Sequence, residues 1–127
     1  MRPPRLDEGP SAALEDLARD ADVPVEVQTS GDRAPPEVEA VAYFIACEAL
    51  TNALKHASPS RVRVRAARED GVLRLIVADD GVGGAMVADG RGLAGMADRV
   101  AASGGTLALN SPAGAGTEIA VELPCAS

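Results

Sequence analysis

Two hydrophobic periods alternate along this chain, and the longer one predicts helices. After Pro35-Pro36, apolar residues recur at helical spacing, which predicts a long helix that begins at the prolines and ends near Ala57. A second helix is expected over about residues 93–103, and a shorter one over about 12–20 with Ser11 as its N-cap. Leu14 and Leu17 would face inward from the short helix; the core stripe of the long one would be Val38, Val41, Ala42, Ile45, Ala49 and Ala53.

The shorter period, an alternation of apolar and polar residues, predicts strands. Residues 23–29 alternate, and Pro24 marks an edge strand or its first residue. Residues 61–65 alternate arginine with valine, so the valines should face inward, and Asp70-Gly71 predicts a hairpin to a buried strand over 72–78. A second hairpin is expected from strands at 106–110 and 117–123. This order of elements predicts an α+β fold, a two-layer sandwich with one mixed sheet covered by helices on one face.

Composition and charge narrow the class of protein. The chain has 127 residues, enough for one domain, and 46% of them are hydrophobic but only 2% aromatic. A net charge of -7 argues against nucleic-acid binding, which needs a basic surface. Three prolines and a glycine within residues 1–10 indicate a linker, which leaves 11–124 as the domain. Two cysteines and the single His56 are too few for a disulfide framework or a zinc site, and no apolar run could span a bilayer.

Four short motifs carry the candidate chemistry. Glu48 and Asn52 lie four residues apart on the long helix, so their side chains project from one face, and Lys55 and His56 continue that face. Asp79 ends a buried strand; an ionised carboxylate only accepts hydrogen bonds, so it suits the amino group of adenine and offers guanine's carbonyl nothing. Alone, the first motif could be an exposed polar helix face and the second a plain turn.

The other two motifs are rich in glycine. Gly81 and Gly83 follow Asp79 and allow the backbone to approach a base, while Gly90-Arg-Gly-Leu-Ala-Gly-Met96 leads into a helix whose N-terminal amides could bind phosphate. The cations that this acidic chain has available to bind phosphate are Lys55, Arg91 and Arg99. Gly114-Ala-Gly-Thr117 would place a threonine hydroxyl beside Asp79. A glycine-rich linker before a helix and a simple hairpin turn are the alternative explanations.

In this order, the four motifs resemble the N-box and the three glycine boxes of the GHKL (Bergerat-fold) ATPases. The wording Gly-Leu-Ala-Gly-Met and the short lid between Gly83 and Gly90 are similar to the ATP-binding catalytic domain of bacterial sensor histidine kinases that partner NarL/LuxR-type response regulators. The resemblance implies ATP and Mg²⁺ as ligands, Asn52 as the magnesium ligand and Glu48 as the catalytic residue. It also implies that nucleotide contacts come from Asn52, Lys55, His56, Asp79, Gly81, Gly83, Arg91, Gly92, Leu93, Gly95, Met96 and Thr117.

The function implied by this resemblance is protein-histidine kinase activity within a two-component system. The domain would transfer the γ-phosphoryl group of ATP to a histidine on a separate dimerisation domain, whose linker would be residues 1–10, for relay to a response regulator. His56 lies on the nucleotide helix, which favours helix capping or phosphate contact over a role as acceptor. The expected location is the cytoplasm, alone or as part of a membrane-anchored sensor. An anti-sigma-factor serine kinase of the same fold and a degenerate nucleotide-binding regulator remain as alternatives.

Overall fold

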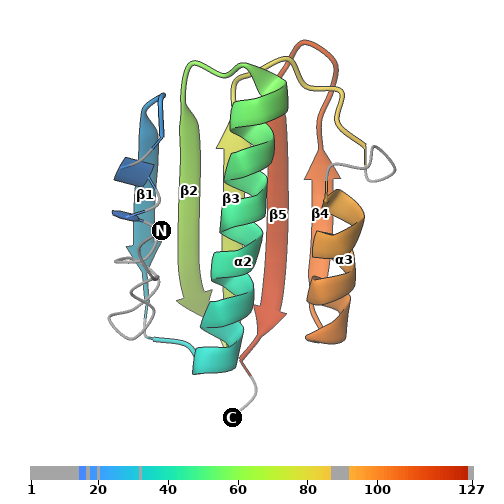
Figure 1. Ribbon diagram of the computed structural model, residues 1–127. Coiled ribbons are helices and arrows are strands. Elements are labelled where there is room, and N and C mark those ends of the chain that lie inside the picture. The colour runs from blue at the N-terminus through green and yellow to red at the C-terminus, as the bar shows by residue number, and fades with distance from the viewer. Residues whose placement is uncertain (1–14, 17, 20, 32, 87–91, 126–127) are drawn as a thin grey trace.

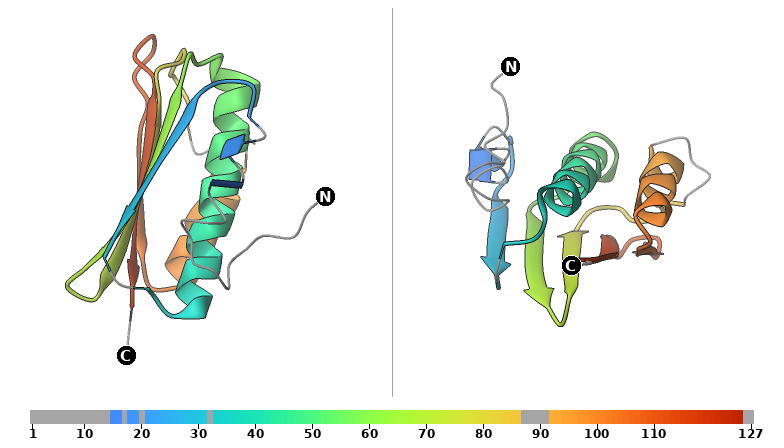
Figure 2. Two further views of the ribbon diagram at one scale, coloured as in Figure 1. Left: turned by 90° about the vertical axis from the view of Figure 1, so that its left-hand side faces the viewer. Right: turned by 90° about the horizontal axis from the view of Figure 1, so that it is seen from below.

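One mixed sheet forms the first layer of the molecule, and helices cover one of its faces (Figures 1 and 2). The computed structural model describes residues 15–16, 18–19, 21–31, 33–86 and 92–125. The sheet has five strands in the order β1-β2-β3-β5-β4. The strands are β1 (Val25–Ser30), β2 (Val62–Glu69), β3 (Val72–Asp79), β4 (Thr106–Asn110) and β5 (Thr117–Pro124). The predicted two-layer α+β sandwich is confirmed.

Strand pairing follows the predicted hairpins, with one addition. β2 pairs with β3 and β4 with β5 in antiparallel register, and β3 also pairs antiparallel with β5. β1 lies at the sheet edge and pairs parallel with β2, so the long helix is the crossover between these two strands. Asp70 and Gly71 both have positive φ, as a tight hairpin turn requires. Pro124 is the last residue of β5, one beyond the expected end of that strand.

The covering helices are α2 (Pro36–Asn52) and α3 (Leu93–Ala102). Ala42, Ile45, Ala49 and Ala53 of the predicted core stripe are buried, while Val38 and Val41 are partly buried against the same core. Inward side chains of β2, β3 and β5 complete this core with Val62, Val64, Leu75, Val77, Val121 and Leu123. None of the helices in the described ranges is long and apolar enough to cross a membrane.

The long helix changes its winding near its end, which the hydrophobic period did not indicate. α2 ends at Asn52 and continues as the π-helical turn η2 (Ala53–Ala57). The carbonyl of Ala57 then accepts a hydrogen bond from the backbone N–H of Val82 (2.9 Å), a contact with a distant loop. The helical segment ends at Ala57 as expected, but a helical period in sequence cannot reveal that its last turn is π-helical or that it makes this contact. Single π turns within α-helices are frequent at functional sites.

Residues near the N-terminus are described only in part. Residues 15, 16, 18 and 19 are helical, in agreement with the expected short helix. The expected cap Ser11, the inward-facing Leu14 and Leu17, and the linker 1–10 lie outside the described residues, as does Arg91.

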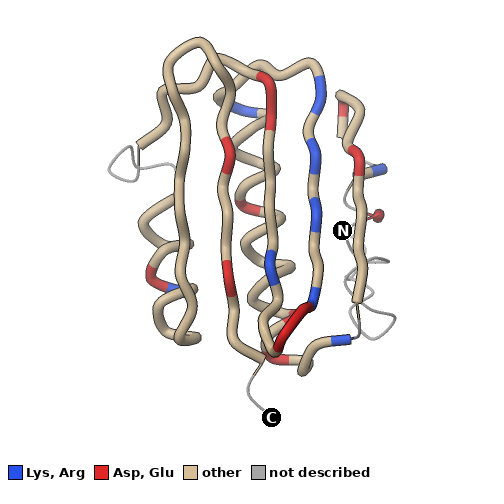
Figure 3. Tube along the Cα trace, turned by 180° about the vertical axis from the view of Figure 1, so that it is seen from behind, with Lys and Arg blue, Asp and Glu red and all other residues tan. Residues whose placement is uncertain are grey.

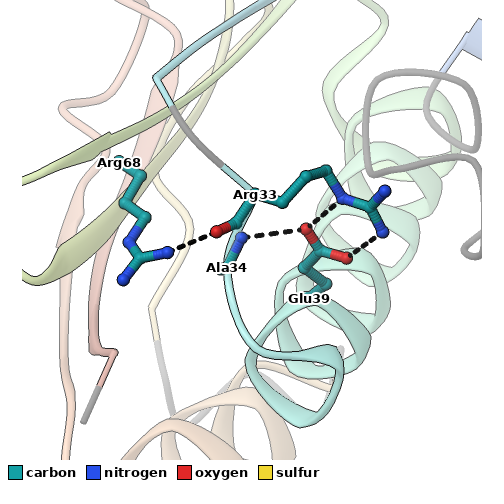
Figure 4. A network of polar contacts seen from close by, with 4 residues as sticks. All are labelled: Arg33, Ala34, Glu39 and Arg68. Carbon is teal, nitrogen blue, oxygen red and sulfur yellow. Dashed lines mark hydrogen bonds and ion pairs between the residues drawn. The ribbon is translucent and has the colours of Figure 1, made fainter. Parts of the chain in front are cut away.

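A polar network closes the beginning of α2 (Figure 4). The Glu39 side chain is only 2% exposed and accepts two hydrogen bonds from the Arg33 guanidinium, both at 2.9 Å. It also accepts the backbone N–H of Ala34 (3.1 Å), while Arg68 of β2 donates to the carbonyl of Arg33. The network therefore ties the segment before α2 both to the helix and to the sheet.

Candidate functional site

A pocket lies at the opposite end of α2 from this network. At that end α2, η2, the end of β3, the beginning of β5 and the start of α3 come together (Figure 1). Six of the predicted site residues line it, namely Asn52, His56, Asp79, Gly83, Leu93 and Thr117. Apolar walls are supplied by Ala49, Ala53, Ala57, Val77, Ala85 and Ile119. The structure thus brings residues of all four sequence motifs to one mostly apolar hollow with a few polar groups, although the Gly90–Met96 motif contributes Leu93 alone.

Asp79 is the acidic group of this pocket. It is the last residue of β3 and pairs across the sheet with Thr117, the first residue of β5. Burial raises the pKa of its carboxyl, and this rise is partly offset by the backbone N–H of Gly81, which donates to Oδ1 at 2.7 Å. The neighbouring Asp80 is exposed, and hydrogen bonds from the Ser60 side chain and nearby backbone lower its pKa. The half-buried carboxylate of Asp79 therefore lines the pocket, and the exposed carboxylate of Asp80 fixes the loop before β2.

Close backbone packing explains the two glycines after Asp79. A Cβ on Gly81 would lie 2.2 Å from the carbonyl oxygen of Ala57, at the end of η2. A Cβ on Gly83, whose φ is +67°, would lie 2.0 Å from the carbonyl oxygen of Pro112. Two backbone hydrogen bonds also join this loop to the segment between β4 and β5. They run from Gly84 N–H to the Ser111 carbonyl (2.7 Å) and from Gly114 N–H to the Val82 carbonyl (2.6 Å). Both glycines are therefore needed to fit this loop between the helix end and the β4–β5 turn.

Asn52 is the polar group of the pocket without a partner inside the protein. Its side-chain Nδ2 is buried, yet none of the described residues provides it with a hydrogen bond. Buried amide groups are nearly always hydrogen-bonded, so a group that is left unsatisfied at a pocket wall suits contact with a ligand. An Asn side chain also offers a carbonyl oxygen, and such oxygens are ligands that Mg²⁺ accepts.

Glu48 lies one turn before Asn52 and beside the start of α3. Its Oε2 would be 3.0 Å from a Cβ on Gly92, the residue that precedes α3 with φ +83°. Glu48 is partly buried but does not line the pocket. Gly95 lies in the first turn of α3, exposed, with no described protein atom within 4 Å of where its Cβ would be. The positive φ of Gly92 therefore explains why this position is a glycine. No packing contact within the described residues explains why position 95 is also a glycine.

The remaining predicted contacts lie outside the pocket. Lys55 is exposed on η2 and Met96 is fully buried (0% exposed) in the core. Neither is among the residues that line the pocket.

Ser111 is a residue of this site that the sequence motifs did not reveal. Its Oγ lies 2.6 Å from Oγ1 of Thr117 and accepts the backbone N–H of Ala85 at 2.9 Å. It thereby connects the glycine loop to the threonine beside Asp79. A serine six residues before the threonine carries no signal by itself, because the contact exists only once the β4–β5 turn has formed.

Comparison with known proteins agrees with this geometry. Residues 37–127 match the family described as histidine kinase-, DNA gyrase B-, and HSP90-like ATPase. The chain is 38% identical over 96 residues to the signal transduction histidine-protein kinase/phosphatase UhpB of Salmonella typhimurium, covering 73% of this chain and 19% of that protein. It is 33% identical to the sensor histidine kinase MctS of Rhizobium johnstonii, covering 98% of this chain and 30% of that protein. The chain therefore spans less than a third of the length of these curated relatives.

Solved structures give the same result. The blue-light activated histidine kinase of Erythrobacter litoralis EL346 superposes with a TM-score of 0.74 at 25% identity, covering 95% of this chain and 41% of that one. The ATP binding domain of PrrB from Mycobacterium tuberculosis has a TM-score of 0.70 at 27% identity, with 89% of this chain and 88% of that one covered. UhpB, MctS and the blue-light activated protein are histidine kinases by name, which favours that expectation over the anti-sigma-factor alternative. The chain belongs to the family of histidine kinase-, DNA gyrase B- and HSP90-like ATPases.

Proposed function

We propose that this chain is the ATP-binding catalytic domain of a sensor histidine kinase and transfers the γ-phosphoryl group of ATP to a histidine on a separate dimerisation domain. The observation that carries the proposal is the pocket itself. It combines the half-buried acceptor Asp79 with the unsatisfied amide of Asn52 in a chain that matches this ATPase family. Relay onward to a NarL/LuxR-type response regulator is part of the same proposal.

Recognition of the base is assigned to Asp79. Its carboxylate faces an apolar hollow between Val77, Ala85 and Ile119, which suits a flat ring with one polar edge. The carboxylate can accept a hydrogen bond from the amino group of adenine, whereas the carbonyl of guanine at that position would meet a second acceptor. Thr117 lies across the sheet from Asp79, and its hydroxyl can assist through a shared water.

The phosphate side is assigned to Asn52 and the start of α3. The side-chain amide oxygen of Asn52 would hold Mg²⁺, which would neutralise part of the negative charge of the phosphates. The described residues contain no group of three His, Cys, Asp or Glu side chains that could hold a metal, so binding would depend on the phosphates. Gly95 fits this assignment, because phosphates at the helix N-terminus would occupy space that a side chain there would enter.

Glu48 is assigned the catalytic role. From α2 it reaches the backbone of Gly92, so it lies between the helix that carries Asn52 and the segment expected to hold phosphate. A carboxylate there would orient a water beside the proposed metal site or assist removal of a proton from the attacking imidazole. His56 is exposed on η2. In this proposal its side chain contacts the phosphates of ATP, but it is not the histidine that receives the phosphoryl group.

A radiolabelled transfer assay tests the proposal. Incubated alone with ATP, the chain should acquire no acid-labile phosphate. When a separate dimerisation domain with an acceptor histidine is added, that domain should become labelled slowly, because no covalent tether raises its effective concentration. Glu48→Ala should depress transfer more than ATP binding, as expected for a group that acts on the transition state.

The His56→Ala variant is the decisive control. Labelling of the added domain should persist in this variant. Strong self-labelling of the wild-type chain that disappears in His56→Ala would overturn the assignment of the acceptor.

A further inference from the structure

One cation that the sequence offers for phosphate binding, Arg99, contacts a different part of the molecule. It is one of two charged residues in α3, and it appears with its neighbour Asp98 as adjacent blue and red segments of that helix in Figure 3. Arg99 lies in the last turn of α3, seven residues after Gly92, so about 10 Å along the helix axis separate it from the end assigned to phosphate. Its guanidinium carbon Cζ lies 4.1 Å from the centre of the Phe44 ring. The charge of Arg99 is therefore held against α2.

The contact between Arg99 and Phe44 joins the two covering helices. α2 and α3 contact each other, lie side by side on the sheet and run in opposite directions (Figure 1). Phe44 is partly buried against the core, whereas Arg99 is exposed, so the guanidinium covers a ring that the core covers only in part. A cation over an aromatic face at this distance is attracted by the ring, and the planar guanidinium also stacks on it. The contact therefore fixes the end of α3 to the middle of α2.

The same two helix faces meet again at the candidate site. Phe44 and Glu48 lie four residues apart on α2 and therefore share a face. Gly92 and Arg99 are seven residues apart, about two turns, and lie on one side of α3. The Glu48 carboxylate oxygen Oε2 would be 3.0 Å from a Cβ on Gly92. A shift of α3 along α2 that breaks the contact at Phe44 therefore also moves Gly92 relative to Glu48.

Packing on the sheet does not by itself set the position of α3 beside α2. Leu93, Met96 and Val100 are the buried residues of α3, and they hold this helix to the core. Hydrophobic burial is non-directional, so it resists separation of α3 from the sheet more than a small lateral shift relative to α2. A guanidinium on an aromatic ring has a specific geometry and opposes that shift.

We propose that Arg99 and Phe44 are positioning residues for phosphoryl transfer, which hold α3 beside α2 so that Glu48 meets phosphates bound at the start of α3. This inference rests on the proposed kinase function. Neither side chain lines the pocket, and ATP is bound mainly by Asp79 and Asn52, which lie on elements other than α3. Loss of the contact therefore lowers the rate of transfer more than the affinity for ATP, because catalysis depends steeply on the position of the catalytic group.

Transfer to an added dimerisation domain, measured together with ATP affinity, tests this inference in the full chain. Phe44→Leu removes the aromatic face and keeps an apolar side chain, while Arg99→Met keeps a long side chain and removes the charge. Each should lower the transfer rate at saturating ATP about fivefold and change the dissociation constant of ATP by less than about twofold. Hydrogen exchange at the amides of α3 should become about two- to fivefold faster in both variants. Phe44→Tyr keeps the aromatic face and should retain most of the wild-type rate.

A double-mutant cycle separates the contact from other roles of Arg99. A cation in the last turn of a helix also interacts favourably with the helix dipole, and that interaction is intact in Phe44→Leu. If the contact carries the effect, Phe44→Leu combined with Arg99→Met should transfer about as fast as either single variant. A double variant whose rate falls by the product of the two single effects would overturn the proposal.

Matched controls lie next to the contact and on the other side of the sheet. Tyr43→Leu removes the neighbouring aromatic side chain of α2, which is hydrogen-bonded to Cys47. Arg65→Met removes one positive charge from β2, on the sheet face away from the helices, because the adjacent Val64 and Ala66 are buried beneath them. Both controls should transfer at about the wild-type rate.

The outcomes distinguish this inference from the kinase function on which it rests. A wild-type chain that binds ATP and transfers nothing would overturn both. A wild-type chain that transfers, with Phe44→Leu transferring equally fast, would overturn the positioning role alone. A strong loss of ATP affinity in Arg99→Met that Phe44→Leu does not share would show that Arg99 binds phosphate, and unchanged hydrogen exchange would show that the contact does not hold α3. Either of these last two results would also overturn the positioning role.

Discussion

The two ends of α2 differ in whether their buried polar groups are hydrogen-bonded within the protein. At its beginning, the buried Glu39 is satisfied by Arg33 and by the backbone of Ala34 (Figure 4). At its end, the buried Nδ2 of Asn52 has no partner among the described residues, and burial raises the pKa of Asp79 nearby. Both ends contain a buried polar side chain from the same helix, so burial alone does not distinguish them.

The difference lies in whether the protein completes the hydrogen bonds itself. A satisfied network in a low-dielectric site holds its segments in one arrangement, whereas an unsatisfied group reduces stability and remains available to a ligand. We therefore expect substitutions at the beginning of α2 to lower stability and leave binding intact. Substitutions at its end should lower binding and leave stability intact or improved.

Glu39→Ala should give the largest effect. It removes the acceptor of three hydrogen bonds and leaves the backbone N–H of Ala34 buried without a partner, so the free energy of unfolding should fall by about 3 kcal/mol. Urea denaturation measures this. Glu37→Ala, an exposed acid in the same first turn, is the control and should cost less than about 1 kcal/mol. ATP affinity of the folded Glu39→Ala protein should equal that of the wild type; a large loss would mean that the two ends are coupled.

Asp79→Asn should have the opposite signature. ATP affinity should fall by about 2 kcal/mol, because a charged hydrogen bond inside the pocket is disturbed, and titration with ATP measures this loss. The raised pKa means that folding favours the protonated carboxyl, so the ionised form reduces stability at neutral pH. The variant should therefore unfold at the same or a higher urea concentration at neutral pH.

The pH dependence separates this explanation from a general effect of lost charge. Any stability advantage of Asp79→Asn should disappear as the pH falls through the raised pKa, where the wild-type carboxyl is already protonated. Asp80→Asn is the control of opposite sign, because the pKa of Asp80 is lowered by its bonds to Ser60 and Arg61. That variant should be less stable than the wild type above the ordinary pKa of an aspartate. Unchanged ATP affinity in Asp79→Asn would remove Asp79 from the site.

Asn52→Ala should act on the metal-dependent part of binding. Magnesium should strengthen ATP binding to the wild type, and this increment should vanish in the variant while ADP binding without metal remains mostly intact. Stability should change little, because the lost Nδ2 makes no hydrogen bond to the described residues. Calorimetry with and without Mg²⁺ separates the metal-dependent part of the affinity from the metal-independent part. Wild-type affinity for Mg-ATP in Asn52→Ala would mean that the helix face from Glu48 to His56 has been misassigned.

The fold was largely predictable because two local periods determine its elements. Alternation along 61–65 placed Val62 and Val64 inward, as observed, and Asp70-Gly71 forms the expected turn to the strand predicted over 72–78. The residues that line the pocket were also predictable in part, because Asn52, Asp79 and Thr117 belong to motifs whose chemistry can be read from residue type.

What could not be predicted depends on contacts between distant segments. The winding of η2, the burial of Glu39 and the role of Ser111 each require a partner far along the chain or on another element. A charged residue in the first turn of a predicted helix is ordinarily exposed, so nothing in the hydrophobic period indicates the burial of Glu39. Only the position of Arg33 and the segment before the helix explains its burial.

Ser111→Ala should give the smallest effect and the most local one. The serine hydroxyl accepts the N–H of Ala85 and contacts the hydroxyl of Thr117, so its loss should release the loop from the threonine and weaken ATP binding by about 1 kcal/mol. Hydrogen exchange at the Ala85 amide should accelerate, which a general loss of stability would not confine to this loop. Ser103→Ala removes a hydroxyl that bonds only the end of α3 and should change neither quantity.

A double-mutant cycle with Thr117→Val decides whether Ser111 acts through the threonine. If it does, Ser111→Ala should cost little additional affinity in the Thr117→Val background, because the contact is already lost. Ser111→Thr keeps the hydroxyl and should recover most of the affinity and the slow exchange at Ala85. Fully additive effects of the two substitutions would show that Ser111 supports the turn without positioning Thr117. ATP binding at the Asn52 end of α2 would then depend on Asp79 and Asn52 alone.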